Sequence, residues 1–481
     1  MPTTLVWLRN SLRLTDQAAL THAAERGAVV PVFVWAPDAE GEWAPGGAHR
    51  WWLHASLQAL DADLQSRASR LSLRQGDPAE QILAAAREAG ADRVVWQVRV
   101  TPHLRRIDQT VREALEAEGI EVRTFAGRIL HDAEAIQTGS GGPYRVFTPF
   151  WNKLRAEMTV GDPLPAPDLG AGRAPDAWPT SVDLDALGLT PEQQDGVDWA
   201  DGMRAVWTPG EAGAQARLDA FLDGALLDYP DGRNRPDEAL TSMLSPHLHW
   251  GEISPRDIWT RVEAWVSNGV TRAAADKFLS EIAWREFAYH VLHHFPETPT
   301  EPLKDKYAAF PWRAAPGDLE AWQRGRTGYP IIDAGMRQLW AMGWMHNRVR
   351  MIVASFLTKD LLVPWQDGAR WFWDTLCGGD LANNTLGWQW AAGCGADAQP
   401  FFRIFNPVSQ GEAHDPDGAY VREWVPELAD LPARWIHHPW DAPDDVLAQA
   451  GVTLGETYPA PMVDHAEARE KALDALKAVN A

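Results

Sequence analysis

Two stretches decide the fold of this chain: GMRQLWAMGWMHNRVRMIVASFL at residues 335–357 and CGGDLANNTLGWQWAAG at residues 377–393. The apolar residues of the first stretch recur at i, i+3, i+4, i+7 and i+8, which predicts a helix with one buried face. They are Val349, Ile352, Val353, Phe356 and Leu357. Asn347, Arg348 and Arg350 stand at the start of this run. Amides and guanidiniums beside such an apolar face need buried partners, so the pattern predicts a bound ligand, and a cofactor is the candidate.

The chain of 481 residues is too long for one ordinary core, and we expect two or three domains. It has no run of eighteen apolar residues, which excludes a membrane span. The N-terminal residues lack the basic and apolar regions of a signal peptide, so we expect a cytoplasmic protein. Cys377 and Cys394 are too few for a disulfide framework or an iron–sulfur site, and we interpret them as small core residues.

The formal net charge of −22 argues against a protein that is coated with nucleic acid, because such binding depends on neutralising phosphates. A local basic groove is still allowed, since a site depends on the local field. The sequence also has 26 tryptophans, concentrated after residue 250. Core packing is their ordinary role, although an indole can also stack on a base or pass an electron.

Residues 1–130 alternate short apolar runs with helical patterns, which is typical of an α/β domain with a doubly wound parallel sheet. The runs, which we interpret as strands buried on both faces, are residues 5–8, 29–35, 71–73, 94–96 and 122–125. The loop after the first run lacks G-x-G-x-x-G, and the chain has no Walker A sequence. The fold class alone therefore gives no function.

Residues 131–205 are rich in Gly, Pro, Asp and Ala, and we interpret them as an interdomain connector. Residues 206–475 are helical almost throughout and predict a second, all-helical domain. The helices predicted there include residues 236–250, 345–358 and 381–392.

In FLSEIAWREF, at residues 278–287, Glu281, Trp284 and Arg285 fall at i, i+3 and i+4 and share one helix face. A salt bridge between Glu281 and Arg285 is one interpretation. The other is a site, because a carboxylate, an indole and a guanidinium can together accept from a base edge, stack on it and hold a phosphate. Upstream, the hydroxyls and turn amides of LTSMLSP, at residues 240–246, precede a predicted helix and suit phosphate oxygens.

Taken together, these segments resemble the photolyase/cryptochrome family over nearly the whole chain. The matching motifs, in order, are LVWLRNSLRLTDQAAL, LTSMLSPHLHWGEISPR, FLSEIAWREF, RTGYPIIDAGMRQLWAMGWMHNRVRM, DLANNTLGWQWAAG, FRIFNPVSQGE and YVREWVPEL. The resemblance implies an N-terminal antenna domain, a long connector and a helical domain that holds FAD at the base of a cavity. It implies no metal.

The resemblance also implies roles for particular residues. The FAD phosphates and their surroundings would be held by Tyr229, Thr241, Ser242, Leu244, Ser245 and Arg285. The flavin end would face Arg350, Asp380 and Asn384. The lesion cavity would be lined by Glu281, Trp284, Asn347, Met351 and Trp390. Arg233 and Arg348 would bind DNA phosphates, and Trp388, Trp365 and Trp312 would form a chain of electron carriers from flavin to surface.

Two asparagines select the member of the family that this chain resembles. Asn384 matches a position beside flavin N5, where photolyases usually carry Asn, and Asn347 stands where (6-4) photolyases carry histidine. The chain therefore resembles cyclobutane pyrimidine dimer (CPD) photolyases, which repair these dimers in DNA by electron transfer from excited reduced FAD. The alternatives are a cryptochrome-type blue-light photoreceptor, a (6-4) photolyase and a generic flavoprotein oxidoreductase.

Three departures from the family pattern stand out. Gly378 replaces the first aspartate of a D-x-D pair, which predicts that Arg350 lacks its usual partner. Asn10 and Ser11 replace a basic and acidic pair. The segment WQVRVTPHLRR, at residues 96–106, lacks the usual antenna residues, so the second chromophore is left open between a folate, a deazaflavin and none.

We expect a monomer whose partner is DNA containing pyrimidine dimers. Despite the acidic composition, we expect that DNA to bind a basic groove around Arg233, Lys277, Arg348 and Arg403.

Overall fold

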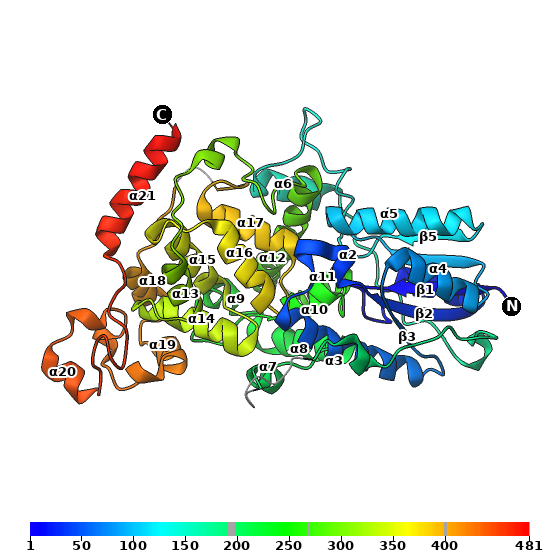
Figure 1. Cartoon of the computed structure of the whole chain (residues 1–481), viewed down its shortest axis with the longest axis horizontal. Coiled ribbons are helices and arrows are strands. Elements are labelled where there is room, and N and C mark those ends of the chain that lie inside the picture. Colours follow the sequence, from blue (N-terminus) through cyan, green and yellow to red (C-terminus); the bar gives the residue numbers. More distant parts are fainter. Residues whose placement is uncertain (191–197, 268, 399–401, 481) are drawn as a thin grey trace.

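A computed structural model describes residues 1–190, 198–267, 269–398 and 402–480 of the chain. The strands gather at the end of the molecule that holds the N-terminus, and helices fill the remainder (Figure 1). No helix among these residues is long and apolar enough to cross a membrane.

The N-terminal sheet is five-stranded and wholly parallel, in the order β3-β2-β1-β4-β5. Its strands are β1 (Thr3–Leu8), β2 (Ala28–Trp35), β3 (Ser72–Gln75), β4 (Arg93–Gln97) and β5 (Glu121–Phe125). The predicted doubly wound fold is confirmed. One expectation was wrong: β5 is not buried on both faces, because it is an edge strand with only β4 beside it, and its residues are exposed or half-buried.

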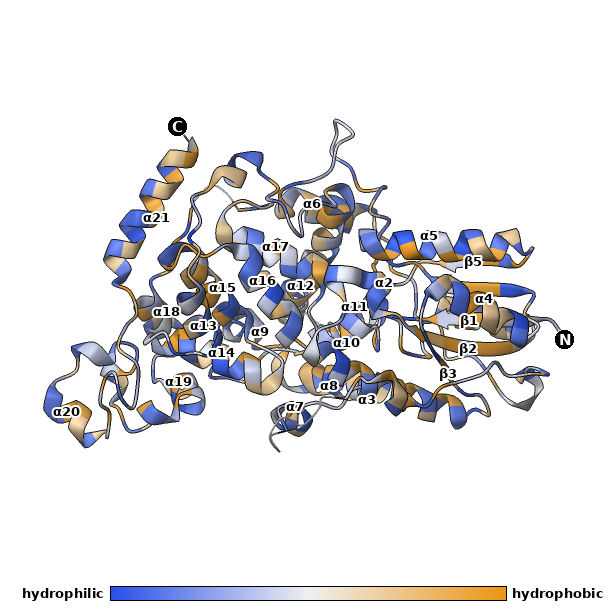
Figure 2. Cartoon of the chain, viewed as in Figure 1, coloured by the Kyte–Doolittle hydropathy of each residue, from blue (hydrophilic) through white to orange (hydrophobic). Residues whose placement is uncertain are grey.

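Alternate residues of the central strands supply two separate cores. Leu5 and Trp7 of β1 face a cluster with α4 and α5, whereas Val6 and Leu8 face a cluster with α1 and α3. These helices are α1 (Ala18–Ala24), α3 (Gly47–Gln65), α4 (Pro78–Glu88) and α5 (Pro102–Ala117), with the short α2 (Pro37–Glu40) beside them. The central strands β1 and β2 are largely apolar, while α5 alternates polar and apolar residues (Figure 2). Helices therefore cover both faces of the sheet.

The predicted connector contains a helix that its composition did not indicate, α6 (Phe147–Glu157). Phe147, Phe150 and Leu154 of α6 are buried in a cluster with the long helix α12 (Gly269–His294). The predicted boundary at 205 falls inside α7 (Asp201–Val206), and the one at 475 falls inside α21 (His465–Asn480). The division into residues 1–130, 131–205 and 206–475 stays a prediction.

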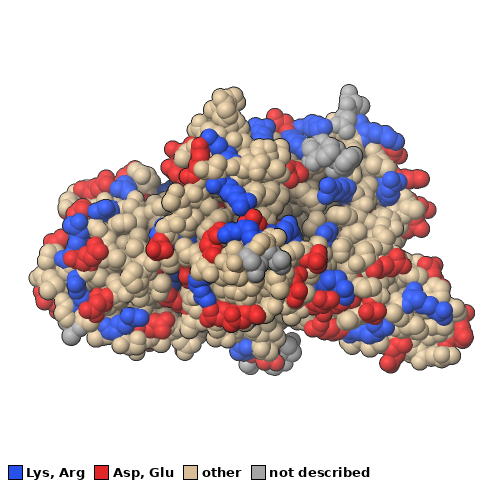
Figure 3. All heavy atoms as spheres, turned by 180° about the vertical axis from the view of Figure 1, so that it is seen from behind, with Lys and Arg blue, Asp and Glu red and all other residues tan. Residues whose placement is uncertain are grey.

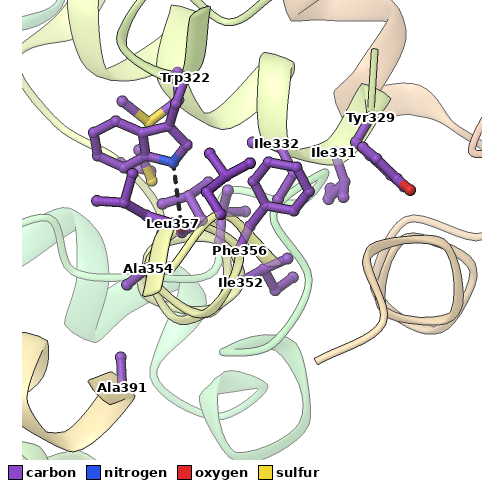
Figure 4. Packing of buried hydrophobic residues seen from close by; sticks show 14 of the residues in the cluster. Trp322, Tyr329, Ile331, Ile332, Ile352, Ala354, Phe356, Leu357 and Ala391 are labelled. Carbon is purple, nitrogen blue, oxygen red and sulfur yellow. Dashed lines mark hydrogen bonds between the residues drawn. The ribbon is translucent and has the colours of Figure 1, made fainter. Parts of the chain in front are cut away.

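The second half of the chain is helical, as predicted. Its helices are α8 (Glu211–Ala220), α9 (Tyr229–Gly232), α10 (Ser245–Trp250), α11 (Pro255–Trp265), α12, α13 (Pro316–Gln323), α14 (Pro330–Met342), α15 (Asn347–Ser355), α16 (Trp365–Thr375), α17 (Leu381–Ala392), α18 (Pro407–His414), α19 (Ala419–Trp424), α20 (Asp444–Gln449) and α21. Apolar residues of α14, α15 and their neighbours form its largest core (Figure 4). Trp322 Nε1 donates to Val353 O at 3.0 Å within that core.

Two predicted helices differ from the structure. Residues 236–250 were expected to form one helix, but only α10 is helical there, because Met243 takes a left-handed φ of 51° and Pro246 sits in the first turn of α10. The helix predicted for residues 345–358 begins at Asn347 and continues past Ser355 as a π-helical turn, Phe356–Asp360.

Helix α17 has the predicted limits, and buried ionisable side chains hold both of its ends. Asp380 is its N-cap, and its carboxylate accepts from Asn383 N at 2.9 Å. Lys359 Nζ donates to Ala391 O at 2.9 Å and to Ala392 O at 2.8 Å, which are among the last carbonyls of the helix. These bonds satisfy terminal groups that a helix cannot pair internally.

Candidate functional site

Four of the residues predicted to hold the FAD phosphates lie in the loop before α10 and at the first residue of that helix. Leu244 is buried, whereas Thr241, Ser242 and Ser245 keep exposed surface. Within the part of the chain that the structure describes, the hydroxyls of Thr241, Ser242 and Ser245 make no hydrogen bond to protein. Three hydroxyls ahead of a helix are thus available to one ligand.

Tyr229 begins α9 and is 7% exposed, with its ring edge-on to Phe278 at 5.4 Å. Burial raises the pKa of Tyr229, and the nearby carboxylate of Glu281 raises it further. The phenol is therefore a neutral hydrogen-bonding group beside Glu281.

Two arginines of the predicted FAD site lack a strong acidic partner. Arg285 is 7% exposed, and its guanidinium reaches Glu286 only at 3.4 Å while lying over the Tyr289 ring at 4.9 Å. Arg350 Nε donates to Met345 O at 2.7 Å, and burial lowers the pKa of Arg350 to about 10. No carboxylate in the described ranges forms an ion pair with Arg350, as Gly378 predicted.

Gly378 is also a steric feature of this backbone. A Cβ atom placed there would lie 2.7 Å from the Pro246 Cα and 2.8 Å from the Ser245 carbonyl carbon. Real Cβ atoms essentially never approach backbone atoms so closely. The first turn of α10 therefore occupies the space that an aspartate at 378 would need.

Asp380 has partners that its motif did not indicate. Its carboxylate accepts from Arg128 Nη2 at 3.3 Å and from the Tyr289 hydroxyl. Burial alone would raise the pKa of Asp380, but the guanidiniums of Arg128 and Arg285 outweigh burial and bring the pKa down to about 2. Asp380 is thus a buried carboxylate at the start of α17 that is ionised at neutral pH.

Asn384 lies one turn further along α17. Its Nδ2 donates to Ala369 O of α16 at 2.9 Å, which fixes the orientation of the amide. That bond uses one donor of the amide, whose carbonyl oxygen remains available to a ligand.

The residues predicted to line the lesion cavity come from α12, α15 and α17. Trp284 is half-buried and stacked on Phe147 of α6, with ring centroids 3.8 Å apart. Asn347 is exposed at the start of α15, and its Nδ2 lies 4.0 Å from the Met351 sulfur. Trp390 of α17 lines a small hollow with Ser355 and carries the Arg403 guanidinium over its ring at 5.5 Å.

Glu281 does not pair with Arg285, so the helix salt bridge considered from the sequence is wrong. Arg233 Nη1 lies 2.7 Å from Glu281 Oε1, and Lys277 Nζ lies 3.4 Å from the same oxygen. The other arginine predicted to bind phosphate, Arg348, donates to Asn234 Oδ1 at 2.7 Å. Basic and acidic side chains are interspersed over the face shown in Figure 3, so the protein has no uniformly basic surface there.

The three predicted electron carriers differ in burial. Trp388 is 2% exposed and Trp365 is 1% exposed, whereas Trp312 is half-buried. The ring contacts of Trp388 are to Phe372 at 5.0 Å and Trp322 at 6.0 Å. Among the described residues no ring contact joins any two of these three tryptophans, and the electron-carrier role stays a prediction.

Sequence reasoning missed Arg128, Phe147, Asn234, Tyr289 and His346. His346 caps α15 by accepting from Arg348 N at 3.2 Å. Arg128 and Phe147 come from the end of the α/β domain and the connector, and no spacing in the sequence links them to α12 or α17. Only the motif HNR, beside Asn347, was a signal that could have indicated His346.

The donors present fit FAD. The hydroxyls of Thr241, Ser242 and Ser245 and the buried Arg285 suit an anionic diphosphate, and Arg350, predicted to face the flavin end, is a cation without a counter-ion among the described residues. In contrast, no group of three or more His, Cys, Asp or Glu side chains in the described residues could hold a metal ion.

A second hollow lies at the carboxyl ends of the strands. Its lining includes Trp35 at the end of β2, Arg99 and His103 after β4, and Trp250 and Trp373 of the helical part. Neighbouring strands β1 and β4 connect in opposite directions here, and α/β sheets bind ligands at such a point.

Comparison with known proteins identifies the family. Residues 4–168 match the family described as DNA photolyase, and residues 278–478 match the FAD binding domain of DNA photolyase. The chain is 49% identical over 478 residues to the deoxyribodipyrimidine photo-lyase of Agrobacterium fabrum, an alignment that covers 99% of this chain and 98% of that one. The chain belongs to the DNA photolyase family, and its helical domain is the FAD-binding domain of that family.

Two further relatives place the chain within the family. The crystal structure of a bacterial class III photolyase from Agrobacterium tumefaciens is 48% identical and superimposes with a TM-score of 0.94, covering 100% of this chain and 98% of that one. Cryptochrome-2 of Arabidopsis thaliana is 40% identical, over 97% of this chain and 77% of its own length. The predicted family and fold are confirmed.

Proposed function

We propose that this chain is a light-driven deoxyribodipyrimidine photolyase that repairs cyclobutane pyrimidine dimers in DNA with reduced FAD as its cofactor. The observation that carries the proposal is the pair of amides, Asn347 beside Met351 and Asn384 anchored to Ala369 O. An amide cannot deliver a proton as an imidazolium or a carboxylic acid can. This supports CPD repair over a (6-4) photolyase and over a cryptochrome-type photoreceptor.

Thr241, Ser242, Ser245 and Arg285 would hold the FAD phosphates, with Tyr229 and Leu244 packed around them. Arg350, Asp380 and Asn384 would hold the flavin end, where Arg350 supplies a positive charge that no carboxylate of the described chain neutralises. When bound, reduced FAD supplies one electron on absorption of light.

The chain's own side chains bind and orient the lesion. Extruding a dimer from the duplex costs roughly a few kcal/mol, and less than extruding an intact pair, because the lesion is already poorly stacked. Trp284, held flat by Phe147, and Trp390 would stack on the extruded dimer. Glu281 and Asn347 would hydrogen-bond its base edges, and Arg233 and Arg348 would bind the flanking phosphates.

The test is direct. The protein is purified, reduced and illuminated with an oligonucleotide that carries one defined cyclobutane dimer, and restored thymines are measured. We expect light-dependent repair of that substrate and none of a matched (6-4) lesion. A reduced protein that leaves the cyclobutane dimer intact under light would contradict the proposal and favour the photoreceptor.

We also propose that the hollow lined by Trp35, Arg99 and His103 takes a second, antenna chromophore. Aromatic and cationic side chains around one concave site suit a flat, anionic molecule such as a folate or a deazaflavin. The absorption spectrum of the purified protein, before and after release of its chromophores, tests this. A spectrum that FAD alone accounts for would contradict it.

We further propose that the protein acts as a monomer in the cytoplasm. Both cysteines are buried and unpaired, which supports a reducing compartment. Size-exclusion chromatography with light scattering and cell fractionation test the two parts separately.

A further inference from the structure

We propose that the ion pair between Arg233 and Glu281 is an ionic lock that weakens binding to undamaged DNA and opens on a lesion. On a lesion, a DNA phosphate takes Arg233 while the extruded dimer takes Glu281. The inference rests on the proposed function, because it assumes that this face meets DNA.

The lock joins two elements that approach from different parts of the chain. Arg233 ends the short helix α9, and Glu281 lies in the middle of α12, with Lys277 one turn earlier on the same face. Both cations use one carboxylate oxygen, Oε1, at 2.7 Å for Arg233 and 3.4 Å for Lys277. The other oxygen, Oε2, makes no hydrogen bond within the described residues, so it can accept one from a ligand.

Glu281 is a carboxylate within a cluster of cations. We define the cationic cluster as Arg233, Lys277, Arg348 and Arg403. Burial lowers the pKa of Arg348, and the charges of Arg233 and Arg403 lower it further, so these guanidiniums are close enough to repel one another. An anion brought to this cluster would relieve that repulsion, and the DNA backbone is such an anion.

The pair is accessible enough to exchange partners. The Arg233 side chain is 18% exposed and that of Glu281 is 25% exposed. Partly exposed ion pairs contribute little to stability, so a phosphate can replace the carboxylate on Arg233 without disturbing the fold. The carboxylate that is left then keeps only Lys277, at 3.4 Å, and stands in the field of a polyanion, so a further donor would stabilise it.

Damaged and undamaged DNA differ in what they offer Glu281. An extruded dimer presents N–H donors at its base edge to the carboxylate, whereas an intact pair stays in the stack and presents none there. On undamaged DNA the Glu281 carboxylate therefore stays paired with Arg233, and the protein makes one phosphate contact fewer than it makes on a dimer. On a dimer both partners are satisfied, so the lock opens.

The experiment measures binding in the dark, as the dependence of the logarithm of the association constant on the logarithm of salt concentration. It uses duplexes of one sequence, with and without a dimer. Each phosphate contact adds about 0.9 to the slope of that plot. We expect the wild-type slope to be steeper by about 0.9 on the dimer than on undamaged DNA.

Glu281→Gln keeps the size of the side chain and removes the charge that holds Arg233. We expect its slope on undamaged DNA to rise by about 0.9 and its affinity there to rise by on the order of tenfold at about 0.1 M salt. The matched control is Asp276→Asn, on the same helix, where the carboxylate pairs with Arg155 and Arg272 outside the cationic cluster. A similar gain in both variants would overturn the lock, because it would show only a change in net charge.

Arg233→Gln tests the other partner. We expect its slope on dimer DNA to fall by about 0.9, to the undamaged value, while its slope on undamaged DNA hardly changes. Adding Glu281→Gln to Arg233→Gln should then produce no steeper slope. A steeper slope in that double variant, or an equal loss of slope on both DNAs in Arg233→Gln, would overturn the proposal.

The outcome is separable from that of the proposed function. Repair is measured under light on DNA that carries dimers. The ionic lock is tested by the salt dependence of binding in the dark, largely on undamaged DNA. A protein that shows these slopes but never repairs would contradict the photolyase proposal alone, and a protein that repairs with unchanged slopes would contradict the lock alone. Thermal unfolding of each variant confirms that it is folded.

Discussion

Enclosed arginines in the two halves of the molecule are neutralised in different ways. In the α/β domain, Arg9 and Arg99 converge on Asp108, which lies 2.7 Å from Arg99 Nη2 and also pairs with Arg9. In the helical domain, Arg285 lies 3.4 Å from Glu286 and helps to lower the pKa of Asp380, and Arg350 donates to the Met345 carbonyl. Buried charge is stable when it is paired, so Arg9 and Arg99 are neutralised by a carboxylate that they share, whereas Arg285 and Arg350 form no short ion pair among the described residues.

The largest loss of stability should come from removing Asp108, the carboxylate that Arg9 and Arg99 share. Asp108→Ala leaves Arg9 and Arg99 enclosed without their shared carboxylate, and we expect it to lower the free energy of unfolding by about 3–5 kcal/mol. Urea unfolding measures this, with Glu116→Ala as the control, because Glu116 is on the same helix in an exposed pair with Arg112. Equal losses of unfolding free energy in the two variants would contradict a stabilising role for the carboxylate that Arg9 and Arg99 share.

Removing FAD should lower the stability of the helical domain, which contains Arg285 and Arg350. A ligand held at a hundred times its dissociation constant stabilises the folded state by about 2.7 kcal/mol, and we expect the protein stripped of FAD to be less stable by at least about that amount. Thermal unfolding with and without added FAD measures the difference. Hydrogen exchange should localise the loss to α10, α12, α15 and α17, and a loss spread equally over the α/β sheet would contradict the contrast.

Acid should act through Asp380. Its folded pKa of about 2 lies below its ordinary value of 3.8, so its stabilisation is present above pH 4 and is lost as the pH falls toward 2. This corresponds to about 2 kcal/mol. Asp380→Asn should therefore flatten the fall in unfolding free energy between pH 4 and pH 2, and an unchanged acid profile in the variant would show that the Arg128 contact is not the cause.

Glu281 belongs to the helical domain, and its substitution should affect repair of the dimer more than the stability of the fold. We expect Glu281→Ala to slow repair per absorbed photon by about tenfold, equivalent to about 1.4 kcal/mol. Its partly exposed pair with Arg233 is worth at most about 1 kcal/mol to stability. Quantum yield of repair and dimer affinity, measured on the same sample, separate the two effects. An unchanged quantum yield would show that Glu281 does not act on the dimer.

The smallest effect has the opposite sign. Arg350→Met removes a cation that has no counter-ion among the described residues, and we expect it to stabilise the FAD-free form by about 1 kcal/mol while weakening FAD binding. Arg337→Met is the matched control, because Arg337 is paired with Glu427 at 2.7 Å and its loss should stabilise neither form. If the FAD-free Arg350→Met protein were less stable than the wild type, the charge of Arg350 would already be compensated within the helical domain.

Much of the fold was readable from local pattern. Continuous apolar runs located the strands, and the limits of α17 follow from an aspartate before it and a glycine after it. The same rules failed at residues 236–250, where a left-handed Met243 interrupts what composition alone made helical. Boundaries depend on backbone geometry that residue types only partly determine.

The sequence predicted many residues of the candidate site but few of the contacts between them. Motifs indicated Asp380, Glu281 and Trp284, but not that Arg128, Arg233 and Phe147 would meet them. Those partners lie between 48 and 252 positions away in the sequence, where helical spacing carries no information. Only the packing of α6, α9 and the end of the α/β domain against α12 and α17 creates these contacts.

Helix α17 is fastened at its start by Asp380 and at its end by Lys359, and between them it carries Asn384, Trp388 and Trp390. Both ends of the helix are therefore held by groups other than Asn384, Trp388 and Trp390. A substitution at Trp390, which is only partly buried, leaves both end contacts in place. This arrangement makes α17 a part of the fold where evolution can change a side chain near the site without redesigning the ends of the helix.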